Sequence, residues 1–464
     1  MFGRNVQSEQ LLPVRDTLQP SGGTGESPDV IPMSSMSGAN TVIWLVGFSE
    51  GLTHLASLAI YYLFKDDLKF TPAVVSLVFV VPAVAWFLKP TFAFLTDAVP
   101  IFGMRRKPYL MMFSLLQSVG YFLLADYATG VVSSILILGL IAVSATFCSS
   151  VAEALLVENS TGNRSAVTAV ADFLSAKAVG SLLVAYLSGA LLETVSKKVV
   201  FWFTAMFPIL ITVGAAMLTD ESTTPYESSS LQFRALLDFL QRPVIWGPAL
   251  YILAYMSGPD YDDTFFFYLT NQLKFPPSFM GTLRFTYGIA AIMGIVLYRT
   301  ILYKVSYRTL LSTSIIVSLP LYLSPVLLVD HINRSWGIPD TVFVLSGGFL
   351  NEAVAELQLL PLLVIGAEIC PPGLEGSVYA ALISVRNLGM ACAKLSSSIG
   401  AWYFHVTATD FTYLAEFIMV CGVFNLVPLP FTFLVPSQAD LKTLKADEKL
   451  VTERAVMQSE AEDI

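Results

Sequence analysis

The sequence has 464 residues, of which 55% are hydrophobic and only 13% are charged. Soluble domains average about 25% charged residues, so this composition excludes an ordinary soluble domain and predicts a chain that lies mostly in lipid. The formal net charge of -9 comes partly from the two ends of the chain, and no basic region supports binding to nucleic acid.

Cysteine and histidine give no sign of a metal centre or of a cofactor. The three histidines are dispersed, and the spacing of the cysteines matches neither a metal site nor a disulfide framework. We therefore expect the cysteines to be small buried residues. They lie in or beside apolar segments, at Cys148, Cys370, Cys392 and Cys421.

The two ends of the chain differ from its middle. Residues 1–40 are polar and lack the apolar core of a signal peptide, which predicts a disordered cytosolic tail. Residues 436–464 are rich in charge, so they can form a short helix but cannot span a membrane.

Between the tails lie twelve apolar segments, each long enough to cross a bilayer as a helix of about 20 residues. They do not alternate in polarity as the shorter strands of a membrane β-barrel do, so we predict an all-α membrane protein. In chain order they lie roughly at 41–64, 72–96, 108–126, 131–157, 167–192, 199–219, 243–271, 278–298, 307–329, 340–368, 374–403 and 411–435.

The longest polar interruption begins at residue 220 and divides these segments six and six. This spacing predicts two six-helix halves, 41–219 and 243–435, joined by a cytosolic loop at 220–242. Within the loop, "LQFRALLDFL" has apolar residues at helical spacing and can lie along the membrane surface.

The distribution of Lys and Arg predicts the orientation. With both tails in the cytosol, the loops on that side hold nine of these residues against six on the other, or fifteen against six when the tails are counted. The glycosylation sequon at Asn333 would then lie outside and be open to modification.

Several ionisable residues fall inside the predicted spans of the first half. Glu50 and His54 share one helical face of the first span, and Glu153 lies in the fourth. In the fifth span, Asp172 and Lys177 point about 140° apart, so we expect each to find a partner on another helix.

In the seventh span, Gly258 and Pro259 break the predicted helix, and Asp260, Asp262 and Asp263 follow. Acids beside such a break are typical of a transporter binding site. One alternative stays open for these acids, which can be solvated because they lie near the outer surface. The aromatic run 265–268 can likewise face lipid or pack internally.

Further charges lie in the eighth, tenth and eleventh spans. Each one alone can be a structural salt bridge, but opposite charges from both halves predict a shared polar cavity between them. The candidate substrate-binding or coupling residues are Glu153, Asp172, Lys177, Asp260, Asp263, Arg284, Glu352, Arg386 and Lys394.

The stretch "FLKPTFAFLTDAVPIFGMRRKPYL" at 87–110 places charge inside and just after an apolar run. Asp97 and the cations Arg105 and Arg106 can close a gating charge cluster together with Lys89. The positive-inside rule alone accounts for Arg105 and Arg106, but not for Lys89 or Asp97.

This stretch resembles the signature loop of the major facilitator superfamily, and it is more similar to the folate–biopterin transporter family within it. The shared pattern is Lys89-Pro90, Asp97, Pro100, Gly103, Arg105-Arg106 and Pro108-Tyr109. Further blocks of the resemblance are "CPPGLEG" at 370–376 with Asn387, "GPDYDDTFFFYLTNQLKFPPSFMG" at 258–281 and "VAEALLVENS" at 151–160.

The resemblance implies secondary-active, proton-coupled transport of folates or pterins by a monomer that spans a plasma membrane or an organelle envelope. A carboxylate such as Asp263 or Glu153 would then hold the amidine-like edge of a pterin. The anionic glutamate tail of a folate would suit one of the cations Lys177, Arg284, Arg386 and Lys394.

Two alternatives remain open at this point. The chain can carry another cofactor-like solute, such as S-adenosylmethionine, or it can be a non-transporting receptor that keeps the fold. An enzyme within the membrane is disfavoured, because the sequence shows neither a nucleophile–base pair nor a cluster of metal ligands at one depth.

Overall fold

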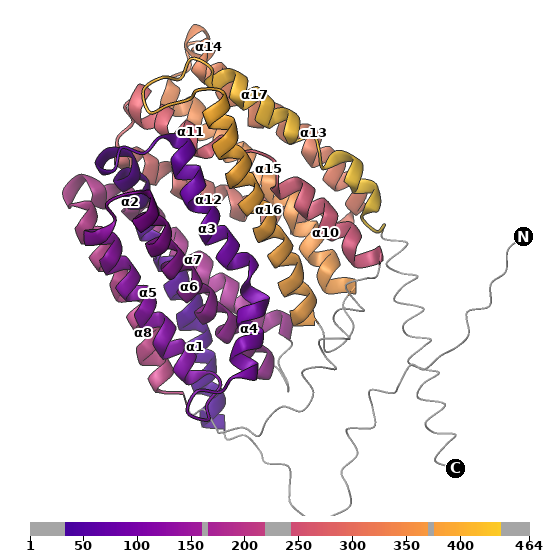
Figure 1. The fold of residues 1–464 in the computed structure, drawn as a ribbon. Helices are drawn as coiled ribbons and strands as arrows, with labels where there is room; N and C mark the ends of the chain where they lie inside the picture. The colour runs from indigo at the N-terminus through magenta and orange to yellow at the C-terminus, as the bar shows by residue number, and fades with distance from the viewer. Residues whose placement is uncertain (1–32, 160–165, 219–242, 370–374, 438–464) are drawn as a thin grey trace, which may run out of the picture.

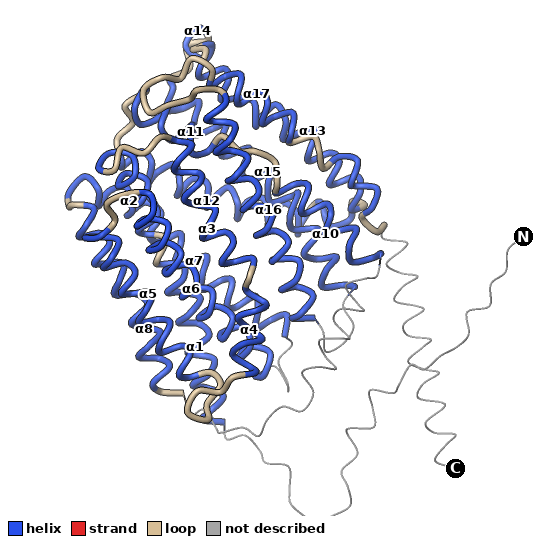
Figure 2. Tube along the Cα trace, in the orientation of Figure 1, coloured by secondary structure: helices blue, strands red, loops and turns tan. Residues whose placement is uncertain are grey.

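The computed structural model describes residues 33–159, 166–218, 243–369 and 375–437. These residues are mostly helical, and the long helices run side by side (Figures 1 and 2). We call α1–α8 the first half and α10–η4 the second half. The predicted tails and the predicted surface helix at 231–240 lie outside the described residues.

The helices of the first half are α1 (Met33–Leu52), α2 (Leu55–Tyr62), η1 (Leu63–Asp67), α3 (Pro72–Phe87), α4 (Lys89–Ala98), α5 (Lys107–Tyr127), α6 (Val131–Asn159), α7 (Ala166–Thr194) and α8 (Lys197–Ala216). Those of the second half are α10 (Pro243–Met256), α11 (Asp262–Phe267), η2 (Tyr268–Gln272), α12 (Pro277–Thr300), η3 (Leu302–Lys304), α13 (Tyr307–Val329), α14 (Ile332–Ser335), α15 (Asp340–Ile369), α16 (Glu375–Tyr403), α17 (Leu414–Phe424) and η4 (Leu429–Leu434).

Each predicted span coincides with one helix or with a short series of helices. Among the described residues, eight helices are long and apolar enough to cross a membrane, or nine when the bent pair α3–α4 counts as one span. The other predicted spans coincide with the broken series α10–α11–η2 and with α15 and α16, which carry the ionisable residues. The prediction of an all-α membrane protein is therefore confirmed.

The helices pack mainly within their own half. In the first half α5 packs against α6 and α8, and α1 against α7, while in the second half α15 packs against α12 and α13. The two halves meet along two long helix pairs, α3 with α16 and α7 with α12. Figure 1 shows α3 and α16 side by side at the boundary between the halves.

An internal repeat relates the two halves. The tripeptide Leu-Lys-Phe occurs at 68–70 and again at 273–275, 205 positions later. Each copy follows a five-residue π-helical turn, and in each copy the lysine, Lys69 or Lys274, has a positive φ, of 54° or 57°. Each is followed at the same offset by the proline that begins the next long helix, Pro72 of α3 or Pro277 of α12. The count of spans alone could not reveal this repeat.

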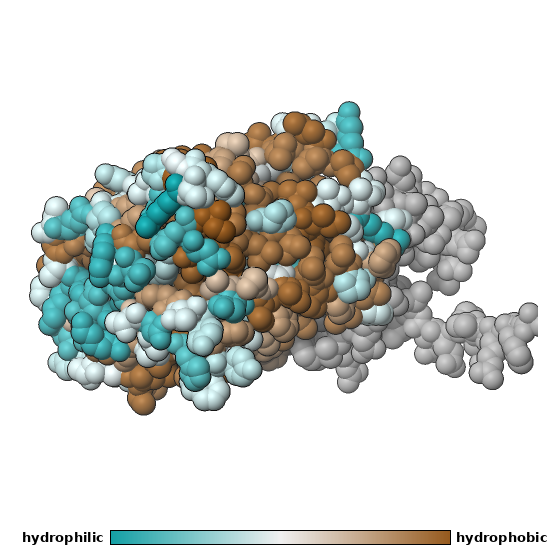
Figure 3. All heavy atoms as spheres, turned by 90° about the horizontal axis from the view of Figure 1, so that it is seen from above, coloured by the Kyte–Doolittle hydropathy of each residue, from teal (hydrophilic) through white to brown (hydrophobic). Residues whose placement is uncertain are grey.

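We distinguish the two ends of the bundle by their helices. The end that carries α2, α11 and α14 is called the α11 end, and the end where α1 begins and α4 terminates is called the α4 end (Figure 1). Ion pairs Lys197–Asp67 and Lys198–Asp126 neutralise charges at the α11 end, at 2.8 and 2.9 Å. Figure 3, which views this end, shows hydrophilic side chains gathered beside a broad hydrophobic area.

Two sequence expectations need correction. Cys148 and Cys421 are buried as expected, but Cys392 is exposed on α16. The side chain of Asn333 is fully buried, and its amide donates to the carbonyl of Ile338 and to the carboxylate of Asp340, at 3.0 and 2.7 Å. This burial argues against the expected glycosylation.

Candidate functional site

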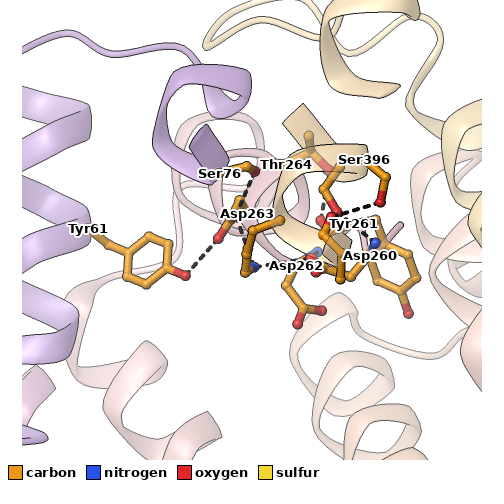
Figure 4. A network of polar contacts seen from close by, with 11 residues as sticks. Tyr61, Ser76, Asp260, Tyr261, Asp262, Asp263, Thr264 and Ser396 are labelled. Carbon is orange, nitrogen blue, oxygen red and sulfur yellow. Dashed lines mark hydrogen bonds and ion pairs between the residues drawn. The ribbon is translucent and has the colours of Figure 1, made fainter. Parts of the chain in front are cut away.

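The seventh predicted span is broken where Gly258 and Pro259 follow α10. Proline has no N–H to donate, so the helical hydrogen-bond pattern stops there and resumes only at α11. Part of the break is satisfied by α16, because the backbone N–H of Asp260 donates to the hydroxyl of Ser397 at 2.8 Å. Of the three acids that follow the break, Asp263 reaches across the boundary between the halves, to Tyr61 and Ser76 (Figure 4).

Asp263 is the centre of a polar network that joins the halves. Its carboxylate accepts from the Tyr61 hydroxyl and from the Ser76 hydroxyl, both at 2.6 Å and both from the first half. From the second half it accepts from the Lys394 ammonium at 3.0 Å, which lies 3.2 Å from Asp260 as well. Asp263 is only 1% exposed, so these donors replace the water that its charge has lost. Figure 4 shows Tyr61 and Ser76 pointing at this carboxylate.

Arg284, on α12, has a different environment. Its guanidinium carbon lies 6.0 Å from the ring centroid of Tyr61, close enough for a cation–π contact. It forms neither an ion pair nor a hydrogen bond with any other described residue. A cation inside a helical bundle is costly without an anion, so Arg284 is suited to bind an anionic ligand group.

The first half contains two ion pairs around Trp86. Lys177 pairs with Glu50, and Lys89 pairs with Glu153 at 2.6 Å. Both ammonium groups lie 5.4 Å from the centroid of the Trp86 ring. The prediction that Lys177 finds its partner on another helix is confirmed, because Glu50 belongs to α1.

Several of these charged side chains keep part of their surface exposed. The side chains of Lys177 and Glu153 remain 34% and 36% exposed, and Lys177 lies near the middle of α7. The side chains of His54 and Asp262 are exposed as well. That these groups share a watery cavity between the halves stays a prediction.

In the second half, α15 and α16 contribute further charges. Glu352 and Glu356 are half-buried, one turn apart on the same face of α15. Arg386 is half-buried on α16, within electrostatic reach of Glu356. The amide of Asn387 crosses to the first half and donates to the carbonyl of Trp86 at 3.3 Å.

The predicted gating cluster is divided between two places. Lys89 begins α4 and binds Glu153, whereas Arg105 and Arg106 lie beyond the other end of that helix. Arg106 is buried, and its guanidinium donates to the hydroxyl of Thr96 at 3.3 Å. The side chain of Asp97 lies outside the described residues.

The remaining expectations have mixed outcomes. Asp172 is exposed on α7, apart from the pair made by Lys177. The aromatic run after the break packs internally, since Phe266, Phe267 and Tyr268 are buried. One alternative was that the acids before this run are solvated residues at the outer surface. It is wrong for Asp263, which is buried.

Tyr61, Ser76 and Trp86 are the residues that sequence reasoning missed. Hydroxyl and indole groups are common in apolar helices, so their types alone carried no signal. The internal repeat does give a signal for Tyr61. Tyr61 stands at the position that Phe266 occupies in the second copy, so the two copies differ there by one hydroxyl group. The two rings pack together with centroids 4.9 Å apart, and only the first carries a hydroxyl.

Solved structures with a similar arrangement of helices identify the fold. A bacterial homologue of the human lysosomal transporter Spinster, in an inward-facing and unoccupied conformation, matches with a TM-score of 0.66 at 12% identity, over 90% of this chain and 99% of that one. The D-xylose–proton symporter matches with a TM-score of 0.62 at 12% identity, over 87% and 98%. The chain therefore has the major facilitator fold and is a multi-pass integral membrane protein. The count of twelve membrane-spanning helices in two halves of six stays a prediction.

Sequence relatives identify the family. The model of the BT1 family matches residues 50–455. "Folate transporter 2" of Plasmodium falciparum (isolate 3D7) is 47% identical over 409 residues, which cover 88% of this chain and 90% of that protein. The "Folate-biopterin transporter" of Synechocystis sp. is 34% identical over 412 residues, covering 86% and 83%. The chain belongs to the BT1 family and is a membrane transporter, as its resemblance to the folate–biopterin transporters implied.

Proposed function

We propose that this transporter carries folates or pterins by alternating access of a site between its two halves. Its relatives that are named as folate transporters supply the class of substrate. The observation within the chain that best supports this substrate class is Arg284, a half-buried arginine on α12 that has no ion-pair partner among the described residues. A folate carries a carboxylate tail that can supply the missing anion.

The other end of the substrate needs a different partner. A pterin presents an N–H and an NH2 group side by side, and a carboxylate can accept both. Asp263 and Glu153, the two acids expected for this role, are already bound to cations within the protein. Glu352 makes no hydrogen bond with a described residue and is only half-buried, so we assign the pterin edge to Glu352.

The arrangement of the halves suggests the direction of access. Hydrogen bonds between the halves gather at the α11 end, where the Lys65 ammonium donates to Asn271 at 2.8 Å and the backbone N–H of Ser278 donates to Glu193 at 3.0 Å. We therefore propose that the α11 end is closed in this conformation and that substrate enters from the α4 end. The positive-inside rule would place the α4 end in the cytosol, together with tails 1–40 and 436–464 and loop 220–242.

The coupling ion and the oligomeric state belong to the same proposal. We propose that protons drive the transport and that the monomer is the working unit. The remaining candidate residues, Asp172, Lys177, Asp260 and Arg386, would help to bind or couple the substrate from both halves.

The test is uptake by proteoliposomes of labelled folate, biopterin and S-adenosylmethionine, with and without a pH gradient. We expect uptake of folate that Arg284→Gln lowers at least tenfold, since a charged hydrogen bond contributes about 1.5–3 kcal/mol. The matched control is Arg299→Gln, in the last turn of the same helix. Equal uptake by Arg284→Gln and the wild type would remove Arg284 from the site.

The same assay separates the competing functions. Transport of S-adenosylmethionine without folate would replace the proposed substrate. Binding of folate without any flux would indicate a receptor.

A further inference from the structure

The closed α11 end is formed by two helix pairs that differ in chemistry. The internal repeat relates α3 of the first half to α12 of the second, since Pro72 and Pro277 begin them 205 positions apart. Helix α3 packs against α16, and α12 packs against α7. A symmetric molecule would close both pairs in the same way.

The α7–α12 pair is closed by direct backbone contact between two glycines. A Cβ atom added to Gly189 would lie 2.8 Å from the Cα atom of Gly281, and one added to Gly281 would lie 2.7 Å from the carbonyl oxygen of Tyr186. Real Cβ atoms do not approach so closely, so the two backbones touch where both side chains are absent. Dispersion holds the contact between these two glycines. The same helix pair has one charged hydrogen bond, from the backbone N–H of Ser278 to Glu193 at 3.0 Å, but both of its partners are at the ends of their helices and neither is buried.

The α3–α16 pair is closed by hydrogen bonds to a buried charge. Ser76 occupies on α3 the position that Gly281 has on α12, again 205 residues apart. Its hydroxyl donates to Asp263, which also accepts from Tyr61 and from Lys394 of α16. Two of these donors belong to the half that must move away when this end opens.

The halves can separate at Asp263 without leaving its carboxylate unpaired. The ammonium of Lys394 lies 3.0 Å from Asp263 and 3.2 Å from Asp260, and all three residues are in the second half. Separation of the halves breaks the bonds from Tyr61 and Ser76 but keeps this ion pair. Water entering the opening can then replace the two lost hydroxyl groups at the carboxylate.

We propose that Tyr61, Ser76 and Asp263 form a releasable latch that holds the α11 end closed, with Lys394 retaining Asp263 when the latch opens. This inference rests on the alternating access of the proposed function. It assigns Asp263 and Lys394 to the control of access and takes them out of the direct binding of substrate. Asp263 is then a positioning residue for the transport cycle.

The experiment measures the distance across the α11 end. Spin labels are attached at Lys69→Cys and Lys274→Cys, which are exposed, belong to different halves and are equivalent in the repeat. The four native cysteines are replaced, and distances are measured by double electron–electron resonance in nanodiscs without substrate. We expect one short distance in this background and a second, longer distance when Tyr61→Phe and Ser76→Ala are combined.

The open-to-closed ratio should rise at least about tenfold, because each lost hydroxyl removes a hydrogen bond to a charged acceptor. The matched control is Tyr109→Phe with Ser118→Ala, which removes buried hydroxyls that bond only within the first half. The control should keep the single short distance. A label pair at Lys69→Cys and Lys198→Cys, both in the first half, should not change in any variant.

An unchanged distance in the Tyr61→Phe, Ser76→Ala variant would overturn the latch. If that variant also bound folate less tightly, the hydroxyl groups of Tyr61 and Ser76 would instead contribute to substrate binding. Failure of wild-type uptake in the proteoliposome assay would reject the proposed substrate, whereas these distances do not depend on any substrate.

Discussion

The pairing of Lys394 with Asp263 permits a quantitative prediction about stability. In the folded protein Lys394 is the cation for two carboxylates, those of Asp263 and Asp260. Its side chain is 18% exposed and that of Asp263 only 1%, so solvent screens the pair weakly. Replacing the ammonium by an apolar group of similar length, in Lys394→Met, leaves two acids close together without a cation.

The expected magnitude follows from the partners that remain. Breaking a buried ion pair by removing one partner costs about 3–5 kcal/mol. Asp263 keeps the hydroxyl groups of Tyr61 and Ser76, so we expect the lower end, about 3 kcal/mol, for Lys394→Met. Asp263→Asn keeps an oxygen acceptor and leaves Lys394 paired with Asp260, so it should cost about 1–2 kcal/mol.

The assay is a double-mutant cycle on the free energy of unfolding, measured by titration with a denaturing detergent. The double variant Lys394→Met with Asp263→Asn should be more stable than the sum of the single changes implies, by about 1–2 kcal/mol. The control is Lys198→Met, whose partner Asp126 is exposed and whose ion pair should contribute little.

The reasoning fails if the single changes are additive within experimental error. It also fails if Lys394→Met is no more destabilising than Lys198→Met. Either result would mean that Lys394 and Asp263 are not coupled in the folded protein.

Two further predictions concern sites away from this pair. Gly281→Ala should destabilise the protein by about 1–3 kcal/mol by forcing α12 away from Gly189, whereas Gly130→Ala, where no atom lies within 4 Å, should be nearly neutral in the same detergent titration. Asn333 should carry no glycan, because its amide is buried against Asp340, and endoglycosidase treatment should leave the mobility of the protein on a gel unchanged. A mobility shift that disappears in Asn333→Gln would contradict this.

The fold could be predicted from the sequence because lipid imposes one simple constraint on a helix. Each segment must be apolar for about 20 residues, and such runs remain visible even where the helix is bent. The break after α10 was equally visible, since Gly258 and Pro259 remove helical hydrogen bonds whatever surrounds them. The internal repeat is partly visible in the sequence, as the tripeptide Leu-Lys-Phe at 68–70 and 273–275, but so short a match occurs readily by chance, and only the backbone shape around Lys69 and Lys274 makes it convincing.

The candidate site was only partly predictable. Burying a charge is costly, so the sequence predicts that its buried charges have partners. The structure shows such partners for Asp263, Lys177 and Lys394. Which partner each one finds depends on packing between helices that are far apart in the chain. Glu50 lies 127 residues from Lys177, and Tyr61 lies 202 residues from Asp263, so no local pattern could indicate either contact.

The pairing of charges also decides which groups are available to a substrate. Lys89 and Lys177 each hold a glutamate of their own half, so a folate that used them would first have to displace that glutamate. Arg284 has no such competitor among the described residues, and binding there neutralises a charge that the empty protein leaves unpaired. This difference is the reason for proposing Arg284 as the site of the substrate anion. Because Arg284 also faces the ring of Tyr61, a bound carboxylate would lie beside the residue whose hydroxyl holds Asp263.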